Sequence, residues 1–287
     1  MMGFDLYQTI TDRIISELEK GTVPWQRPWT CPTGAISHVT GKPYSVLNQL
    51  MLPQSGEYVT FKQALAEGHP VRKGEKSHMV FFFKIVENKD RDTGEITSIP
   101  FLRYYSVFHI SQCERMKPRF AVSVEQGNPL QPDARAEQII NDYIQRSGVK
   151  LVVTESNEAY YQPSQDKIVV PELKQYACVS EYLSTIVHEC VHSTGHPKRL
   201  NRITNPAAFG SETYSKEELV AELGAAYIVN AVGLETAASF RNSAAYIQNW
   251  LEVLKNDRRF IVSAAGKAEK AVKMILGEQE GVNADGV

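Results

Sequence analysis

Hydrophobic and polar positions recur along the first half of the chain with two different spacings, one helical and one extended. Leu6, Ile10, Ile14 and Leu18 are four residues apart and Gly21 follows them, which predicts an amphipathic helix with a defined C-terminal end. The stretches "SHMVFFFKIV" and "IPFLRYYSVFHI" are rich in β-branched and aromatic residues, and the polar "ENKDRDTGE" between them predicts a hairpin. A short helix is predicted in "EYVTFKQALAEG", so the first half is α+β.

The second half mixes the same two spacings. A helix in "ARAEQIINDYIQRSG" precedes the predicted strands "VKLVVTES" and "DKIVVP". The next two helices, "SEYLSTIVHECVHSTG" and "SKEELVAELGAAYIVNAVG", have Ser180 and Ser215 as their predicted N-caps, and two more helices occupy 239–277. The polar stretch "QGNPLQPD" at 126–133 contains two prolines and separates the halves. We therefore predict an α+β protein with two domains, residues 1–125 and 134–287.

Composition narrows the class of protein without identifying it. The 287 residues are 43% hydrophobic and 22% charged, which is ordinary for a globular chain. The N-terminus has no signal-peptide pattern, no apolar run is long enough to span a bilayer, and the four cysteines lack CxxC spacing. These features predict a cytoplasmic protein. The net charge is −2, although residues 1–120 carry 15 Lys and Arg against 12 Asp and Glu, so an anionic partner would meet this half.

The pentapeptide "HECVH" at residues 188–192 is the strongest chemical signal in the chain. On a helix, His188 and His192 lie on one face, about 6 Å apart along the axis, where both imidazoles can reach one zinc ion. Glu189 then lies beside the metal, where it can act as general base toward a water molecule. The alternative is that both histidines are ordinary residues of an apolar helix.

A catalytic zinc needs a third protein ligand, and the sequence offers three candidates. Glu218 and Glu222 lie on one face of the helix in "EELVAELGAA", so one can bind the metal while the other orients a histidine. His196 is disfavoured, because Gly195 and Pro197 end the helix there. We expect zinc as the cofactor, with Mn²⁺ or another divalent ion as a replacement, because occupancy follows availability as well as geometry.

The first half carries aromatic and basic residues in the combination used to bind single-stranded nucleic acid. Bases stack on aromatic rings, and cations neutralise phosphates. "PWQRPW" interleaves aromatic and basic residues, "VRKGEK" is a basic turn, and "RYYSVF" places Arg103, Tyr104 and Tyr105 on a strand. The candidates for DNA binding are Trp25, Arg27, Trp29, Tyr44, Arg72, Lys73 and Lys76.

Longer stretches resemble a known family. "GKPYSVLN", "YVTFKQALAEGHPVRKGEK" and "YYSVFHISQ" resemble the N-terminal domain of ArdC-type antirestriction proteins of conjugative plasmids, a domain shared with TraC-type primases. "HECVHSTGHPKRLNR" and "YSKEELVAELGAAYI" resemble the zincin-like metallopeptidase domain of the same family. The resemblance implies a domain that binds single-stranded DNA, followed by a peptidase domain, and it favours Glu218 as the third ligand with Glu222 behind it.

Three functional hypotheses follow. The first is an antirestriction protein that binds single-stranded DNA, protects incoming plasmid DNA from restriction, and carries a zinc site of peptidase type that acts on an unknown protein or peptide substrate. In the second, the metal only holds the fold while the protein shields DNA. In the third, the chain is a peptidase with no role on DNA.

Overall fold

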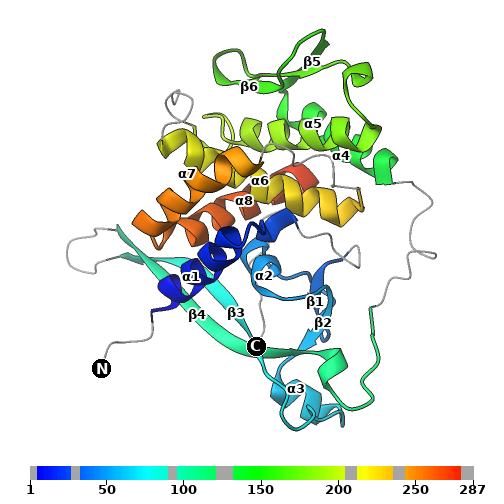
Figure 1. The fold of residues 1–287 in the computed structure, drawn as a ribbon, viewed down its shortest axis with the longest axis vertical. Coiled ribbons are helices and arrows are strands. Elements are labelled where there is room, and N and C mark those ends of the chain that lie inside the picture. The colour runs from blue at the N-terminus through cyan, green and yellow to red at the C-terminus, as the bar shows by residue number, and fades with distance from the viewer. Residues whose placement is uncertain are drawn as a thin grey trace.

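The fold is described here from a computed structural model, which places residues 5–26, 33–89, 96–120, 132–203, 212–234 and 243–278. Helices and strands occur in both halves, which confirms the predicted α+β class (Figure 1). The helices are α1 (Leu6–Glu19), α2 (Val46–Met51), α3 (Phe61–Ala66), α4 (Pro132–Ser147), α5 (Val179–Thr194), α6 (Glu212–Val232), α7 (Ser243–Asn256) and α8 (Phe260–Leu276). The strands are β1 (Ala35–Ser37), β2 (Gly56–Val59), β3 (His78–Lys89), β4 (Ile96–His109), β5 (Lys150–Thr154), β6 (Tyr160–Gln162) and β7 (Lys167–Pro171).

The N-terminal sheet has the strand order β1-β2-β4-β3, in which β1 and β2 are parallel and the other pairs are antiparallel. Strands β3 and β4 form the predicted hairpin, in register from His78↔Val107 to Lys89↔Ile96. The outer edge of β3 is closed by Asn48 of α2, whose side chain accepts from Phe81 N at 2.7 Å and donates to Phe81 O at 2.9 Å. An exposed strand edge invites pairing with other chains, so this side chain replaces a missing strand at one position.

The second half places a small sheet on one side of a helical layer. Its strand order is β5-β7-β6, with β5 parallel and β6 antiparallel to β7. Helix α5 lies under this sheet, and α6, α7 and α8 follow below it (Figure 1). Ile168 and Val170 of β7 are fully buried because their side chains face α5.

One apolar core joins the two halves. The buried face of α1, formed by Ile10, Ile14 and Leu18, belongs to the same cluster as residues of α5, α6, α7 and α8. Polar contacts cross the same boundary, since Thr11 Oγ1 donates to Arg258 O at 2.8 Å. The predicted limits of the domains, 1–125 and 134–287, stay a prediction, because residues 121–131 lie outside the described chain.

Three predicted helix starts are wrong. The short helix predicted in "EYVTFKQALAEG" begins only at Phe61, because residues 57–59 belong to strand β2. Cys178 occupies the N-cap position of α5 without a side-chain hydrogen bond, and Ser180 lies inside the helix with its hydroxyl donating to Asp133 at 3.1 Å. Helix α6 begins at Glu212, which places Ser215 inside its first turns, where it is buried. Ser215 and Glu218 have the spacing of a capping box, but packing of α6 against the core extends the helix toward its N-terminus, beyond Ser215. Among the described residues, no helix is long and apolar enough to cross a membrane.

Candidate metal centre

Helix α5 brings both imidazoles of "HECVH" to one point, as the spacing predicts. Nε2 of His192 lies 3.1 Å from Nε2 of His188, so the two nitrogens face each other across a small gap. Apolar residues on successive turns, including Val187 and Val191, are fully buried and fix the helix against the core. The histidines are therefore oriented by packing and not only by each other.

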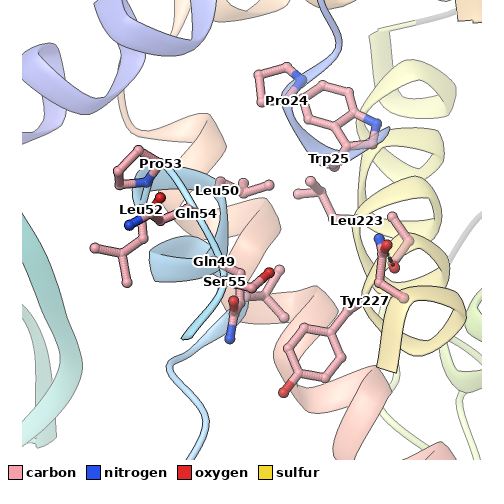
Figure 2. Close-up of a pocket in the computed structure, with 13 residues that line it drawn as sticks. Pro24, Trp25, Gln49, Leu50, Leu52, Pro53, Gln54, Ser55, Leu223 and Tyr227 are labelled. Atoms are coloured by element: carbon pink, nitrogen blue, oxygen red, sulfur yellow. Dashed lines mark hydrogen bonds between the residues drawn. The ribbon is translucent and has the colours of Figure 1, made fainter. Parts of the chain in front are cut away.

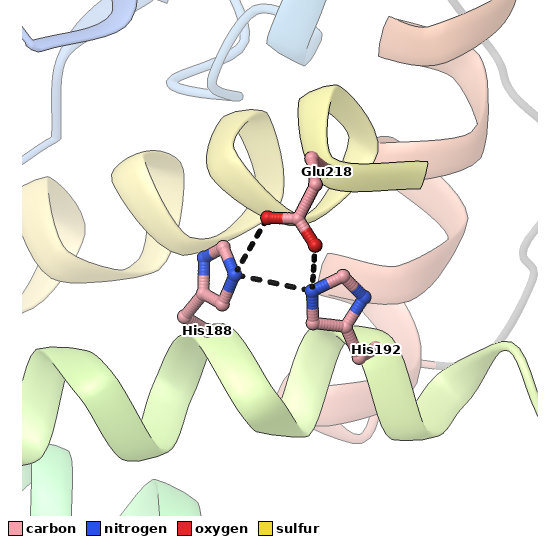
Figure 3. A group of neighbouring side chains, drawn as sticks. All are labelled: His188, His192 and Glu218. Carbon is pink, nitrogen blue, oxygen red and sulfur yellow. Dashed lines mark hydrogen bonds and ion pairs between the residues drawn. The ribbon is translucent and has the colours of Figure 1, made fainter. Parts of the chain in front are cut away.

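Helix α6 supplies a carboxylate to the same point (Figure 3). The carboxylate oxygens of Glu218 lie 3.6 Å from Nε2 of His188 and 3.3 Å from Nε2 of His192. Gly224 permits this close approach of α6 to α5, because a Cβ atom there would lie 3.1 Å from the side chain of Val191. Among the described residues, His188, His192 and Glu218 form the one group of three ligand-type side chains whose donor atoms converge within 4.8 Å.

The donor set fits a divalent ion. Two imidazole nitrogens and one carboxylate are the ligands of catalytic zinc, and ligands about 2.0–2.1 Å from a tetrahedral ion are about 3.3–3.4 Å apart. The two Nε2 atoms are 3.1 Å apart, and each faces a different oxygen of Glu218, at 3.6 Å from His188 and 3.3 Å from His192. One donor atom from each residue lies within 4.8 Å of the other two, so small side-chain adjustments suffice to bring the three ligands onto one ion.

A second layer of side chains stands behind the histidines. Nδ1 of His192 faces Glu217 at 3.4 Å, and Arg202 in turn donates to Glu217 at 2.7 Å. Nδ1 of His188 faces Glu222 at 4.0 Å. A carboxylate on the far nitrogen fixes the ring and leaves Nε2 available to a metal. Glu217 and Arg202 are not among the residues predicted from the sequence, although Glu217 directly precedes Glu218 and Arg202 lies in the motif "HPKRLNR".

The charges of the centre are coupled. Burial lowers the pKa of both imidazoles, but bonding and attraction from Glu218 outweigh it, so the pKa values of His188 and His192 are raised. Burial opposes ionisation of Glu218, yet the two histidines hold its pKa far below the usual range. The Glu218 carboxylate is thus charged, and the protonated imidazoles balance its charge. A metal ion bound here would replace the protons of the imidazoles.

Glu189 lies on the same helix and is only 6% exposed. Burial raises the pKa of Glu189, and the nearby histidines and a backbone hydrogen bond from Tyr161 of β6 reduce this rise without cancelling it. A carboxylate whose pKa is raised in this way holds and releases a proton closer to neutral pH than an exposed one. Its place beside the converging ligands suits a general base.

Trp25, predicted as a surface for DNA bases, faces this centre from the N-terminal half instead. The ring is 3% exposed and packs edge-on against Trp250 with centroids 5.1 Å apart, so neither face is open to a base. Figure 2 shows its indole nitrogen directed at α6, at the border of a pocket of about 130 Å³ between the halves. Nε1 of Trp25 and Oε2 of Glu222 are both buried, and neither atom has a hydrogen-bond partner within bonding distance among the described residues. Burial raises the pKa of Glu222, and the nearby indole N–H of Trp25 offsets a part of this rise.

The other residues predicted to bind DNA differ in their exposure and in their contacts. Tyr44 packs edge-on against Tyr58 at 6.2 Å, and Arg72 is paired with Glu75 at 2.7 Å. Lys73 and Lys76 are exposed. Arg27 and Trp29 lie outside the described residues. His196, the weaker candidate ligand, is apart from the metal group, with Nδ1 4.0 Å from Asp166.

Comparisons with known proteins match two different families to separate parts of the chain. The N-terminal domain of the anti-restriction factor ArdC matches residues 4–108, and a family described as zincin-like metallopeptidase matches residues 135–267. Two DNA primases TraC from Escherichia coli are 34% and 30% identical over 96% of this chain, which spans only 27% and 20% of their length. An uncharacterized protein of Sinorhizobium fredii, y4eC, is 29% identical and is covered over 92% of its length.

Two solved structures match almost end to end. Both are crystal structures of the antirestriction ArdC protein from plasmid R388, one metal-free and one bound to Mn(II). They are 33% and 32% identical to this chain, with TM-scores of 0.75 and 0.76. Each comparison covers 96% of this chain and 98% of the solved one.

Proposed function

Because the chain belongs to the ArdC antirestriction family, we propose that it protects incoming plasmid DNA from restriction, binds single-stranded DNA through its N-terminal half and carries a metal-dependent peptidase site. The observation that carries the peptidase site is the convergence of His188, His192 and Glu218 beside Glu189. The Mn(II)-bound relative supports the binding of a divalent ion, and the ligand chemistry at this position favours zinc. The match to the ArdC N-terminal domain and to TraC primases supports the DNA-binding half.

Each residue of the centre has a separate role in peptide hydrolysis. His188, His192 and Glu218 would hold the ion, and Glu217 and Glu222 would keep the imidazoles in orientation. A divalent ion at this position supplies Lewis acidity toward a carbonyl oxygen. Glu189 would accept the proton of the attacking water and later donate it to the leaving amine.

The test of the peptidase role is Glu189→Gln in the full chain, loaded with zinc and assayed on fluorescently labelled casein. We expect the variant to retain one ion per chain and to lose hydrolysis by about 10²-fold or more, since proton transfer of this kind contributes about 10²–10⁴-fold. Glu158→Gln is the matched control, because it makes the same change at an exposed position of the same half. Unchanged hydrolysis in Glu189→Gln would reject Glu189 as general base.

A second function is favoured by the burial of the centre. Glu189 and Glu218 are 6% and 7% exposed, which suits a metal that holds α5 to α6 in a protein that only shields DNA. The two functions differ in a restricting host. If Glu189→Gln protects incoming plasmid DNA as well as the wild-type chain does, proteolysis is not needed for protection and the shielding function holds.

A further inference from the structure

The N-terminal sheet exposes aromatic side chains that the metal centre does not use. Phe61 is 53% exposed and Tyr104 is 48% exposed, and the half-buried Phe108 lies beside Phe61, with the two ring centroids 6.4 Å apart. We call Phe61, Phe108 and Tyr104 the aromatic strip. Large apolar side chains gathered on a surface mark binding sites more often than singly exposed ones do.

The backbone explains how the strip is built. Tyr104, Ser106 and Phe108 are alternate residues of β4, so their side chains point to one face and successive ones are about 7 Å apart. Strand β2 pairs with β4 only at Tyr58↔His109 and Val59↔Phe108. After that the chain turns into α3 through a capping box at Thr60, which sets Phe61 beside Phe108.

A small polar residue separates the rings. Ser106 is exposed and lies between Phe108 and Tyr104 on the same face of β4. Tyr104 and Phe108 are therefore separate rings on one face of the strand, and bases of a single strand can stack on separate rings of this kind.

Exposed lysines lie at the same end of β4. The turn at 72–76 is tied there by Arg72 N, which donates to Gln112 O at 3.0 Å, and by Gln112 Nε2, which donates to Lys76 O at 2.9 Å. Neither Lys73 nor Lys76 makes an ion pair with another described residue. Lys62, next to Phe61 on α3, is exposed as well.

We propose that single-stranded DNA binds along the aromatic strip, with bases against Phe61, Phe108 and Tyr104 and phosphates near Lys62, Lys73 and Lys76. Rings flanked by free cations suit a polyanion with exposed bases better than an apolar protein partner, which the lysines would oppose. Paired bases hide their faces, so duplex DNA is expected to bind more weakly. The inference rests on the proposed function, because it locates the surface for the DNA-binding half.

The test compares Phe61→Ala and Tyr104→Ala, singly and together, with the wild-type full chain. Binding is measured by fluorescence anisotropy with a labelled oligothymidylate at several salt concentrations. Each loss of a stacking ring is expected to weaken binding at least about fivefold without changing the salt dependence. Tyr160→Ala is the matched control, because Tyr160 is 42% exposed but lies on β6 of the other half.

The outcomes separate this inference from the function on which it rests. If the wild-type chain binds the oligonucleotide and the double variant binds it equally well with an unchanged unfolding temperature, the strip is not the DNA surface, while the proposed function stands. If the wild-type chain itself does not bind, the DNA-binding function fails first. If Phe61→Ala unfolds the protein, the exposed Tyr104→Ala alone decides the question.

Discussion

The metal centre and the N-terminal sheet differ in how their functional residues are held. In the centre, two helices carry every proposed ligand, each histidine has a carboxylate behind it, and Glu189 and Glu218 are nearly buried. On the sheet, the lysines and two of the three rings of the aromatic strip are exposed, and these residues come from a turn, a short helix and a strand. Deep, paired groups fix one small ion, while exposed, separate groups suit a long and flexible polymer.

The largest effect that would sharpen this contrast is loss of the ion. His192→Ala removes one of three converging ligands, so we expect metal content to fall from about one ion per chain to less than about a tenth. The stabilisation that bound metal adds to folding should disappear as well. Elemental analysis measures the first effect, and His196→Ala, whose imidazole lies apart from the group, should keep its metal. Full metal in His192→Ala would show that the ligands are misassigned.

The next largest effect is expected at the end of α5. Arg199 donates to Ser193 O at 2.7 Å and to Asp166 Oδ2 at 3.0 Å, and its side chain is 7% exposed. Asp166 is 21% exposed, so the pair is only partly buried. Hydrogen bonds to charged groups contribute about 1.5–3 kcal/mol, so Arg199→Met should lower the free energy of unfolding by that order. Urea denaturation checks this, with Lys198→Met as the exposed neighbour that should change little.

The same ion pair predicts a pH dependence. Burial raises the pKa of Asp166, but hydrogen bonds from Arg199 and Tyr161 outweigh burial and leave it below the ordinary value of 3.8. The contribution of a carboxylate with a lowered pKa is complete above its unfolded value and is lost as the pH falls through the folded one. The stability difference between wild type and Arg199→Met should therefore be constant near neutral pH and shrink below about pH 4. A difference that grows in acid would contradict this assignment.

A smaller effect on zinc affinity is expected from Trp25, a residue of the N-terminal half that faces the metal centre. Trp25→Phe keeps an aromatic ring against Trp250 but removes the N–H that faces Glu222 behind His188. Loss of a direct partner behind a metal ligand costs about 10–100-fold in affinity, and Trp25 is one contact further away. We expect zinc affinity to fall by about threefold to tenfold, measured by competition with a chelating dye. Trp250→Phe makes the same change in the other ring of the pair and serves as the control. An equal loss of zinc affinity in this variant would show that altered packing, and not the N–H of Trp25, causes the effect.

The smallest effect concerns the lysines. Replacing Lys73 and Lys76 together by alanine should lower the slope of log affinity against log salt by about two. Arg72→Ala should change the slope less, because Glu75 already compensates its charge. The measurement is the oligothymidylate titration described above. An unchanged slope in the double variant would place the phosphates elsewhere.

The two regions also differ in how well the sequence predicts them. An i, i+4 pair on a long apolar helix fixes the relation of His188 to His192, and the placement of Glu218 needs only the packing of α6 on α5. Whether an aromatic residue is buried or exposed, by contrast, depends on parts of the chain that are distant in sequence. Trp25 is buried because α7 and α6 of the other half cover it, and Phe61 is exposed because α3 ends the contact of β2 with β4.

Short elements were missed for the same reason. Strands β1 and β6 have three residues each, and α2 has six, too few for hydrophobic spacing to identify them. Their positions depend on distant partners, such as the pairing of Ile36 with Glu57 and of Tyr161 with Ile168. The predicted hairpin and the long helices, by contrast, contain enough residues for their patterns to decide.

The most direct measurement is anomalous scattering at the zinc edge from crystals of the full chain grown with zinc. We predict one peak per chain, about 2.0–2.2 Å from Nε2 of His188, Nε2 of His192 and a carboxylate oxygen of Glu218. Glu222 should then lie behind His188, near its Nδ1, where it lies at 4.0 Å now. A peak ligated by Glu222 in place of Glu218, or no peak between the two imidazoles, would contradict the proposed centre.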